Sequence, residues 1–114
     1  MLDYSQIEKY DHSGMHKIYD RWPTIVKEVY ESKLDPIDFK NIDHIVFAGM
    51  GGSGAIGDFF GSILSKTNVH VSIVKGYFLP NTVDKNTLVV TTSVSGNTIE
   101  TLKVLESAHK LDCN

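Results

Sequence analysis

Two short turns rich in glycine and hydroxyl residues constrain this chain more than any other feature of its sequence. Residues 49–54 read Gly-Met-Gly-Gly-Ser-Gly, and residues 93–98 read Ser-Val-Ser-Gly-Asn-Thr. Each turn directly follows an apolar, β-branched run and directly precedes a helical pattern of apolar residues. We therefore expect both at strand-to-helix turns, where backbone N–H groups and the start of a helix face an incoming anion.

The segments around the turns predict an α/β fold. Strands are expected at residues 45–48, 69–74 and 87–92, with a helix after each glycine turn. Strands that alternate with helices form βαβ units, so the sheet should be parallel and buried. A fourth strand would be expected where the chain stops, so we expect residues 41–114 to be a domain truncated after its third strand and the helix that follows.

The residues before the first strand are predicted to be helical. Apolar side chains recur at helical spacing between residues 13 and 31, and Pro23 interrupts them. Proline is tolerated in the first turn of a helix and disrupts its interior, so we expect two short helices that meet near Trp22, with Pro23 beginning the second. The predicted organisation is an N-terminal helical segment, residues 1–40, followed by an α/β domain, residues 41–114.

The helix after the first turn carries two stripes. Glycine recurs at Gly54, Gly57 and Gly61. Each costs a helix about 1 kcal/mol relative to alanine, so a close approach of backbone is expected there. The larger apolar side chains share another face: Ile56, Phe59, Phe60, Ile63 and Leu64.

The last helix is predicted to begin at Asn97. Asn97 and Glu100 have the spacing of a capping box, and Glu106 with Lys110 forms a favourable i,i+4 pair. Four side chains are expected to face inward: Ile99, Leu102, Leu105 and Ala108.

Composition excludes several classes of partner. The net charge of -3 argues against nucleic acid or an anionic membrane, which both favour a basic patch, but not against phosphate held by neutral N–H groups. The single cysteine, Cys113, excludes an internal disulfide framework and is typical of a reducing cytoplasm. No stretch is long and apolar enough to span a membrane, and the N-terminus lacks a signal-peptide pattern. A cytoplasmic protein is therefore expected.

The first turn also satisfies G-x-G-x-x-G, the fingerprint of dinucleotide-binding folds. That interpretation needs an acidic residue about 20 residues further on, to hold a ribose hydroxyl. Lys75 stands near that place, which weakens NADP without excluding it. A P-loop needs Lys and Ser/Thr where Ala55 and Ile56 stand, which argues against nucleoside triphosphate hydrolysis.

The second turn favours a phosphorylated small molecule. Ser93, Ser95 and Thr98 offer three hydroxyls within six residues, and Gly96 relaxes the backbone between them. Charge-assisted hydrogen bonds contribute about 1.5–3 kcal/mol each, so three or four suit micromolar-to-millimolar binding. A dinucleotide fold has no need of this cluster. The alternative is a serine-rich capped turn without a ligand.

The two motifs together resemble the sugar isomerase (SIS) domain. More narrowly, residues 49–53 and 93–102, with the segment 75–80, are similar to the N-terminal part of the bifunctional phosphoglucose/phosphomannose isomerases. Val94 departs from the tyrosine usual in that family, and residues 54–58 rearrange the usual glycine run. The resemblance implies a three-layer α-β-α, flavodoxin-like fold of which residues 41–114 are a part.

The resemblance also implies a ligand and its binding residues. The partners would be sugar phosphates, namely glucose 6-phosphate, fructose 6-phosphate and mannose 6-phosphate, with no cofactor and with homodimers in the full-length family. The phosphate would be bound by Ser93, Ser95 and Thr98. The sugar and its reacting carbons would lie against Gly51, Gly52 and Ser53.

Aldose–ketose isomerisation needs a base, and no residue of this chain is a convincing one. His44 and His70 precede their strands and should lie at the sheet edge opposite the turns, and His109 ends a helix that runs back to that edge. His12 and His16 are four apart but lack a third metal ligand. No catalytic and no metal-binding residue is therefore predicted.

Three functions remain open at the level of sequence. The favoured one is the phosphosugar-binding part of a phosphoglucose/phosphomannose isomerase, inactive by itself. The others are a non-catalytic phosphosugar sensor of the same fold and an NADP-binding Rossmann fragment. Glu100 is expected to cap its helix rather than to touch a ligand.

Overall fold

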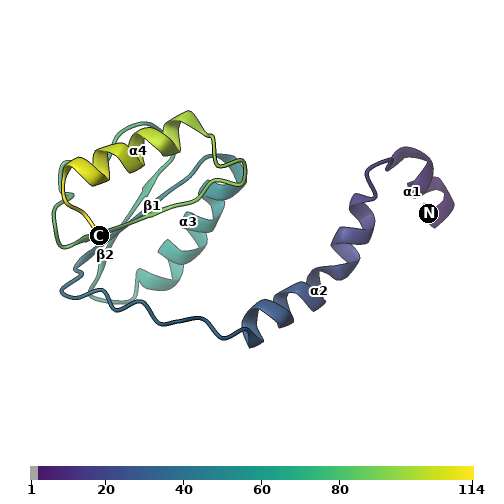
Figure 1. Cartoon of the computed structure of the whole chain (residues 1–114), viewed down its shortest axis with the longest axis horizontal. Coiled ribbons are helices and arrows are strands. Elements are labelled where there is room, and N and C mark those ends of the chain that lie inside the picture. Colours follow the sequence, from purple (N-terminus) through teal and green to yellow (C-terminus); the bar gives the residue numbers. More distant parts are fainter. Residues whose placement is uncertain (1–2) are drawn as a thin grey trace. The chain divides into compact units, whose positions relative to one another are not determined.

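The computed structural model describes residues 3–114. The chain divides into two compact units, one that ends at Ile37 and one that spans Asp38–Asn114. The first unit contains helices α1 (Tyr4–Tyr10) and α2 (Met15–Glu31), and the second contains the sheet and two further helices (Figure 1). None of the helices in the described part is both long and apolar enough to cross a membrane.

The expected pair of helices meeting near Trp22 is wrong. Pro23 lies inside one continuous helix, α2, and the break in helical structure comes earlier, at Asp11–Gly14. Gly14 has a φ of 66°, in the left-handed region, and the Asp11 carboxylate accepts a 2.7 Å hydrogen bond from the backbone N–H of His16. These two local signals begin α2, whereas Pro23 only removes one donor from the interior of a long helix.

The sheet has the predicted parallel arrangement. Its strands are β1 (His44–Ala48), β2 (His70–Val74) and β3 (Thr87–Thr91), in the spatial order β2-β1-β3. In the register of the sheet, Ala48 lies opposite Val74 and Thr91, so the three strands end at the same level. The segments that follow β1 and β3 therefore leave neighbouring strands at one edge.

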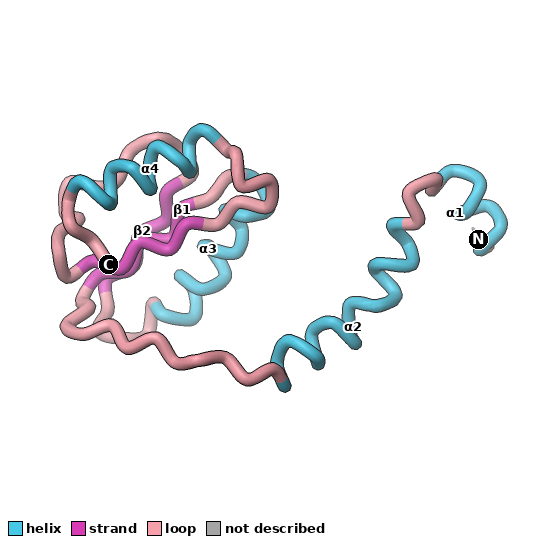
Figure 2. The backbone as a smooth tube through the Cα atoms, viewed as in Figure 1, coloured by secondary structure: helices cyan, strands magenta, loops and turns pink. Residues whose placement is uncertain are grey.

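Helices α3 (Gly51–Leu64) and α4 (Ile99–Lys110) cover opposite faces of the sheet (Figure 2). Successive side chains of a strand point to opposite faces. Val46 is fully buried in one core cluster with Val104 of α4, while the next residue, Phe47, lies against Gly57 of α3. The unit is thus layered α-β-α around a thin aliphatic core.

The glycine stripe of α3 faces the sheet, as predicted. A Cβ built on Gly57 would lie 2.9 Å from Phe47 Cβ, and one on Gly61 would lie 3.1 Å from Ile73 Cδ1. Glycine therefore lets the backbone of α3 approach β1 and β2 closely. Four of the five larger apolar side chains of α3, all but Leu64, stay substantially exposed, from 43% at Phe60 to 63% at Phe59.

The predicted inward face of α4 is wrong except for Ala108. Three of the four expected residues are substantially exposed: Ile99, Leu102 and Leu105. The buried residues are instead Thr101, Val104 and Ala108. Two rows of apolar side chains lie next to each other on this helix, and the row with the smaller side chains packs against the strands.

The predicted start of α4 is also displaced. The helix begins at Ile99 with Thr98 as N-cap and without a side-chain capping bond, so the capping box of Asn97 and Glu100 is wrong. The Glu100 carboxylate instead accepts a 3.2 Å hydrogen bond from the Tyr77 hydroxyl. The hydroxyl of the N-cap residue Thr98 is hydrogen-bonded to Ser93 and Ser95 rather than to the helix.

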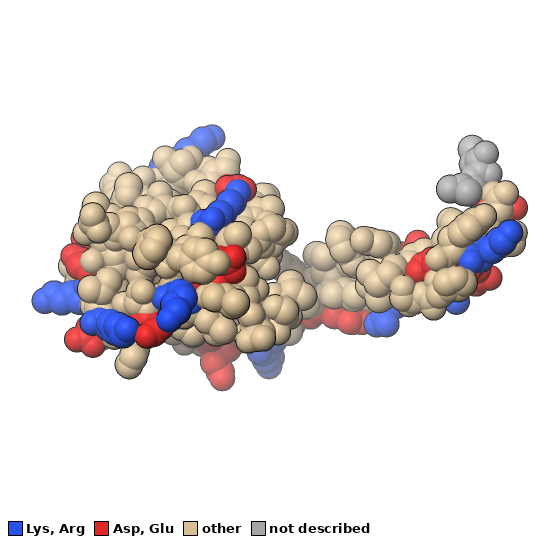
Figure 3. Space-filling model, turned by 90° about the horizontal axis from the view of Figure 1, so that it is seen from above, with Lys and Arg blue, Asp and Glu red and all other residues tan. Residues whose placement is uncertain are grey.

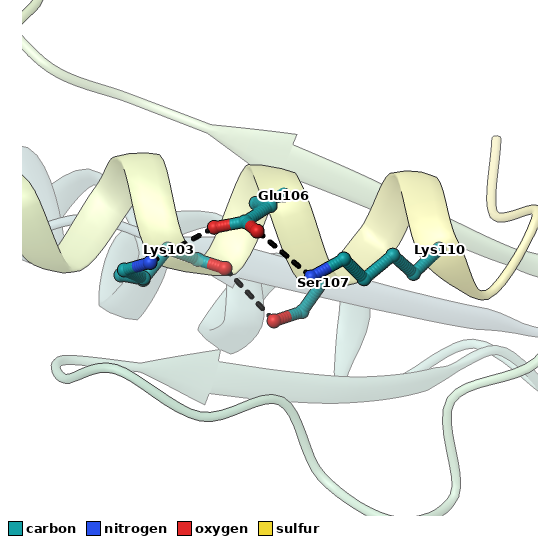
Figure 4. Close-up of polar contacts among 4 residues, drawn as sticks. All are labelled: Lys103, Glu106, Ser107 and Lys110. Carbon is teal, nitrogen blue, oxygen red and sulfur yellow. Dashed lines mark hydrogen bonds and ion pairs between the residues drawn. The ribbon is translucent and has the colours of Figure 1, made fainter.

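The solvent face of α4 carries a short network of charges (Figure 4). The Glu106 carboxylate accepts hydrogen bonds from Lys110 Nζ at 2.7 Å and Lys103 Nζ at 3.0 Å, so the predicted i,i+4 pair is confirmed. These two ammonium groups lower the pKa of Glu106 to about 2. Lys and Arg alternate with Asp and Glu over the visible surface, without a broad patch of one sign (Figure 3).

Candidate functional site

Both glycine turns lie at the carboxyl edge of the sheet. The first joins β1 to α3, and the second joins β3 to α4. Because β1 and β3 are neighbours, the turns are side by side, and the Thr92 N–H donates to the Ala48 carbonyl at 2.8 Å. A Cβ at Gly49 would lie 3.0 Å from the Thr92 carbonyl oxygen, so a side chain there would crowd the neighbouring turn.

The two turns open onto one hollow of about 450 Å³. The first turn and α3 contribute Met50, Gly52, Ser53 and Ile56, and the second turn contributes Val94, Ser95 and Thr98. Four of the six predicted binding residues therefore line the same space. The two turns that meet there, residues 49–54 and 93–98, are about 40 residues apart in the chain.

Gly51 and Ser93 are not among the residues that line this hollow. Gly51 is the first residue of α3 and has a φ of 55°, a left-handed conformation that glycine adopts at little cost. Gly51 therefore allows the sharp turn by which the chain enters the N-terminus of α3. Ser93, the first residue of the second turn, is half-buried, and its hydroxyl is hydrogen-bonded to Thr98 and to the Gly96 N–H.

The hydroxyls of the second turn form one hydrogen-bonded cluster. Ser93 Oγ lies 2.9 Å from Thr98 Oγ1, and Ser95 Oγ lies 3.3 Å from the same atom. The backbone N–H of Gly96 donates to Ser93 Oγ at 3.1 Å, with Gly96 at a φ of 68°. The cluster therefore holds the hydroxyls of Ser95 and Thr98 at the wall of the hollow.

Two helices begin at the hollow. Their N-cap residues, Met50 for α3 and Thr98 for α4, make no side-chain capping hydrogen bond. The first N–H groups of a helix have no acceptor within the helix, and the helix dipole places partial positive charge at the same end. Both helix starts can therefore donate to an anion in the hollow.

None of the seven lining residues carries a titratable side chain. Two charged residues near the turns in the sequence pair with each other: Lys75 Nζ lies 2.6 Å from the Asp58 carboxylate. An anion in this hollow would be held by neutral hydroxyl and N–H donors. Met50, Ile56 and Val94, which the sequence-based prediction did not assign to the site, give it an apolar wall.

The histidines lie where the sequence predicted. His44 and His70 begin β1 and β2, at the edge of the sheet opposite the turns, with ring centroids 4.5 Å apart. His16 Nδ1 contacts the Asp11 carboxylate at 2.7 Å, and His109 lies in the last turn of α4. Within residues 3–114, no group of three or more His, Cys, Asp or Glu side chains is placed to hold a metal ion.

A parallel sheet with two helix starts and a hydroxyl cluster at the carboxyl edge of adjacent strands is an arrangement typical of α/β proteins that bind small anions. Residues 38–113 match the SIS domain family, and the chain belongs to this family. No solved structure matches the chain.

Curated relatives share parts of this chain. A bifunctional phosphoglucose/phosphomannose isomerase of Pyrobaculum calidifontis is 36% identical over 95% of the chain and 33% of its own length. Another of Aquifex aeolicus is 50% identical over 56% of the chain and 21% of its own length. A D-glucosamine-6-phosphate 4-epimerase of Sulfolobus acidocaldarius is 35% identical over 85% of the chain and 30% of its own length. The chain thus spans a third or less of the length of these relatives.

Proposed function

We propose that the unit Asp38–Asn114 binds a sugar phosphate in the hollow between the two turns. The phosphate would lie against the hydroxyls of Ser95 and Thr98 and the start of α4, with Ser93 holding the cluster. The sugar would extend toward Gly51, Gly52 and Ser53. The observation that carries this proposal is that both turns contribute neutral hydrogen-bond donors to one hollow.

The names of the relatives support a phosphosugar as ligand more strongly than any one reaction. Two of them are named for isomerisation of phosphorylated glucose and mannose, and the third is named for 4-epimerisation of D-glucosamine 6-phosphate. The reactions differ, while a hexose phosphate is common to the names. The names therefore support binding of a hexose phosphate, rather than one particular reaction, as the function proposed for this chain.

We further propose that the chain is the N-terminal part of a cytoplasmic aldose–ketose isomerase. This enzyme would interconvert glucose 6-phosphate or mannose 6-phosphate with fructose 6-phosphate, and it would work as a homodimer. Such a reaction moves a proton between two carbons through an enediolate and requires a base. The described residues that line the hollow supply none. The 114-residue chain is accordingly expected to bind substrate without isomerising it.

The same lack of a base favours a second candidate, a phosphosugar sensor without catalysis. A dinucleotide site is disfavoured, because Lys75, which would have to meet the 2′-phosphate of NADP, is paired with Asp58. A 2′-phosphate bound at Lys75 would lie close to the Asp58 carboxylate, which is 2.6 Å from Lys75 Nζ, and the two negative groups would repel each other.

Calorimetric titration of the chain with glucose 6-phosphate, fructose 6-phosphate, mannose 6-phosphate and NADPH tests the proposal. We expect the sugar phosphates to bind and Ser95→Ala to weaken them about tenfold, because one charge-assisted hydrogen bond contributes roughly 1.5 kcal/mol. The exposed Ser62 on α3 provides the control variant Ser62→Ala, which should bind normally. Binding of NADPH alone would contradict the phosphosugar site. Turnover of fructose 6-phosphate by the chain would contradict its expected inactivity.

A further inference from the structure

We propose that Met50, Ile56 and Val94 form an apolar wall that contacts the carbon atoms of the bound phosphate ester, and that Val94 makes the site prefer an ester over free phosphate. This inference rests on the proposed function, because it assigns a role to the remaining side chains of the same hollow.

Val94 is the least expected side chain of the second turn. It is 96% exposed, although the residues on either side of it are serines whose hydroxyls take part in the cluster. An apolar side chain that is as exposed in the folded chain as in the unfolded one contributes nothing to the hydrophobic stability of the fold. Packing within this chain therefore does not account for a valine at this position.

A single exposed apolar residue is ordinary on a protein surface, but Val94 is not isolated. It shares the hollow with Met50 and Ile56, which come from the start of α3 on the neighbouring strand-to-helix connection. Ile56 is itself 44% exposed. Three apolar side chains from two separate segments thus converge where the hydroxyls of Ser95 and Thr98 also converge.

The two kinds of wall match the two parts of a phosphate ester. The phosphate oxygens accept hydrogen bonds from hydroxyl and N–H donors, whereas the ester methylene and the C–H groups of a sugar gain from apolar contact. Inorganic phosphate has only the first part and gains nothing from Val94. The wall should therefore raise the affinity for the ester alone.

The isosteric variant Val94→Thr tests this inference, with Val94→Ala as a second variant. We expect both to weaken the binding of glucose 6-phosphate roughly three- to tenfold, the effect of losing a partly buried apolar contact. The dissociation constant of inorganic phosphate should stay unchanged. Because Val94 is 96% exposed, neither variant should change the thermal midpoint of unfolding. Val26→Thr on α2, at a position that is 67% exposed, is the matched control and should bind as the unmodified chain does.

Three results would overturn the inference. If both ligands weaken equally, Val94 acts on the shape of the turn and not on the ester carbons. If neither weakens while Ser95→Ala still does, the phosphate site stands and the apolar wall is wrong. If the unmodified chain binds neither ligand, the proposed function fails and the inference fails with it.

Discussion

His44 is buried at the amino edge of the sheet, at the opposite end from both turns. It is 4% exposed, its Nε2 lies 2.9 Å from Ser72 Oγ, and its ring meets that of His70. Burial, and then the charge of His70, lower the pKa of His44 below its ordinary value of 6.5. The backbone of Thr82 and the carboxylates of Asp43 and Asp84 act in the opposite direction and only reduce this shift.

Stability should consequently fall in mild acid. The unfolded chain takes up a proton at His44 more readily than the folded chain, so this contribution is complete above about pH 6.5 and is lost as pH falls through 6.5 to the lower folded pKa. We predict that His44→Gln flattens the dependence of the unfolding free energy on pH in this range. Chemical denaturation between pH 5 and 8, spanning the titration of an ordinary histidine at about 6.5, measures it. The exposed His12 gives the control variant His12→Gln, and an equal effect of both variants would refute the assignment to His44.

At the scale of elements, α3 depends on glycine for contact with the sheet, but not equally at each position. The nearest atom to a Cβ at Gly57 is Phe47 Cβ, at 2.9 Å, which cannot move without the backbone of β1. The nearest atom at Gly61 is Ile73 Cδ1, at 3.1 Å, the far end of a flexible side chain. The same substitution should thus have opposite consequences four residues apart.

We predict that Gly57→Ala destabilises the unit by about 1–3 kcal/mol, because overpacking exceeds the gain in helix propensity. Gly61→Ala should be neutral or should stabilise by up to about 1 kcal/mol, because Ile73 can adjust and alanine favours the helix. Denaturant unfolding of the two variants side by side provides the measurement. Equal destabilisation would mean that the approach of α3 to the sheet is uniform along the helix.

The elements also show where prediction from sequence succeeds. The three strands and the role of the glycine stripe follow from local runs and from the cost of glycine in a helix, which are properties of single segments. The prediction of the inward face of α4 was wrong because two apolar rows overlap on this helix. Only the contact with the buried Val46 selects the row that contains Val104. The capping box failed because Glu100 contacts Tyr77, a partner 23 residues away that no local pattern contains.

At the scale of the whole molecule, the order β2-β1-β3 creates the candidate site. It places β1 beside β3, so that turns from distant segments share one hollow. The sequence placed both turns at strand-to-helix connections, and the resemblance to the SIS family implied that they share one ligand. The apolar wall could not be predicted in the same way, since Ile56 reads as part of a core-facing helix pattern and Val94 as an exception within a polar turn.

The central claim is that both turns bind one ligand, and amide chemical-shift mapping by NMR during titration with glucose 6-phosphate tests it most directly. We predict that the amides of residues 50–54 and 93–99 shift together, with one common dissociation constant, while those of His44 and His70 at the far edge of the sheet stay unchanged. Shifts confined to one turn, or located away from both, would contradict a shared phosphosugar site.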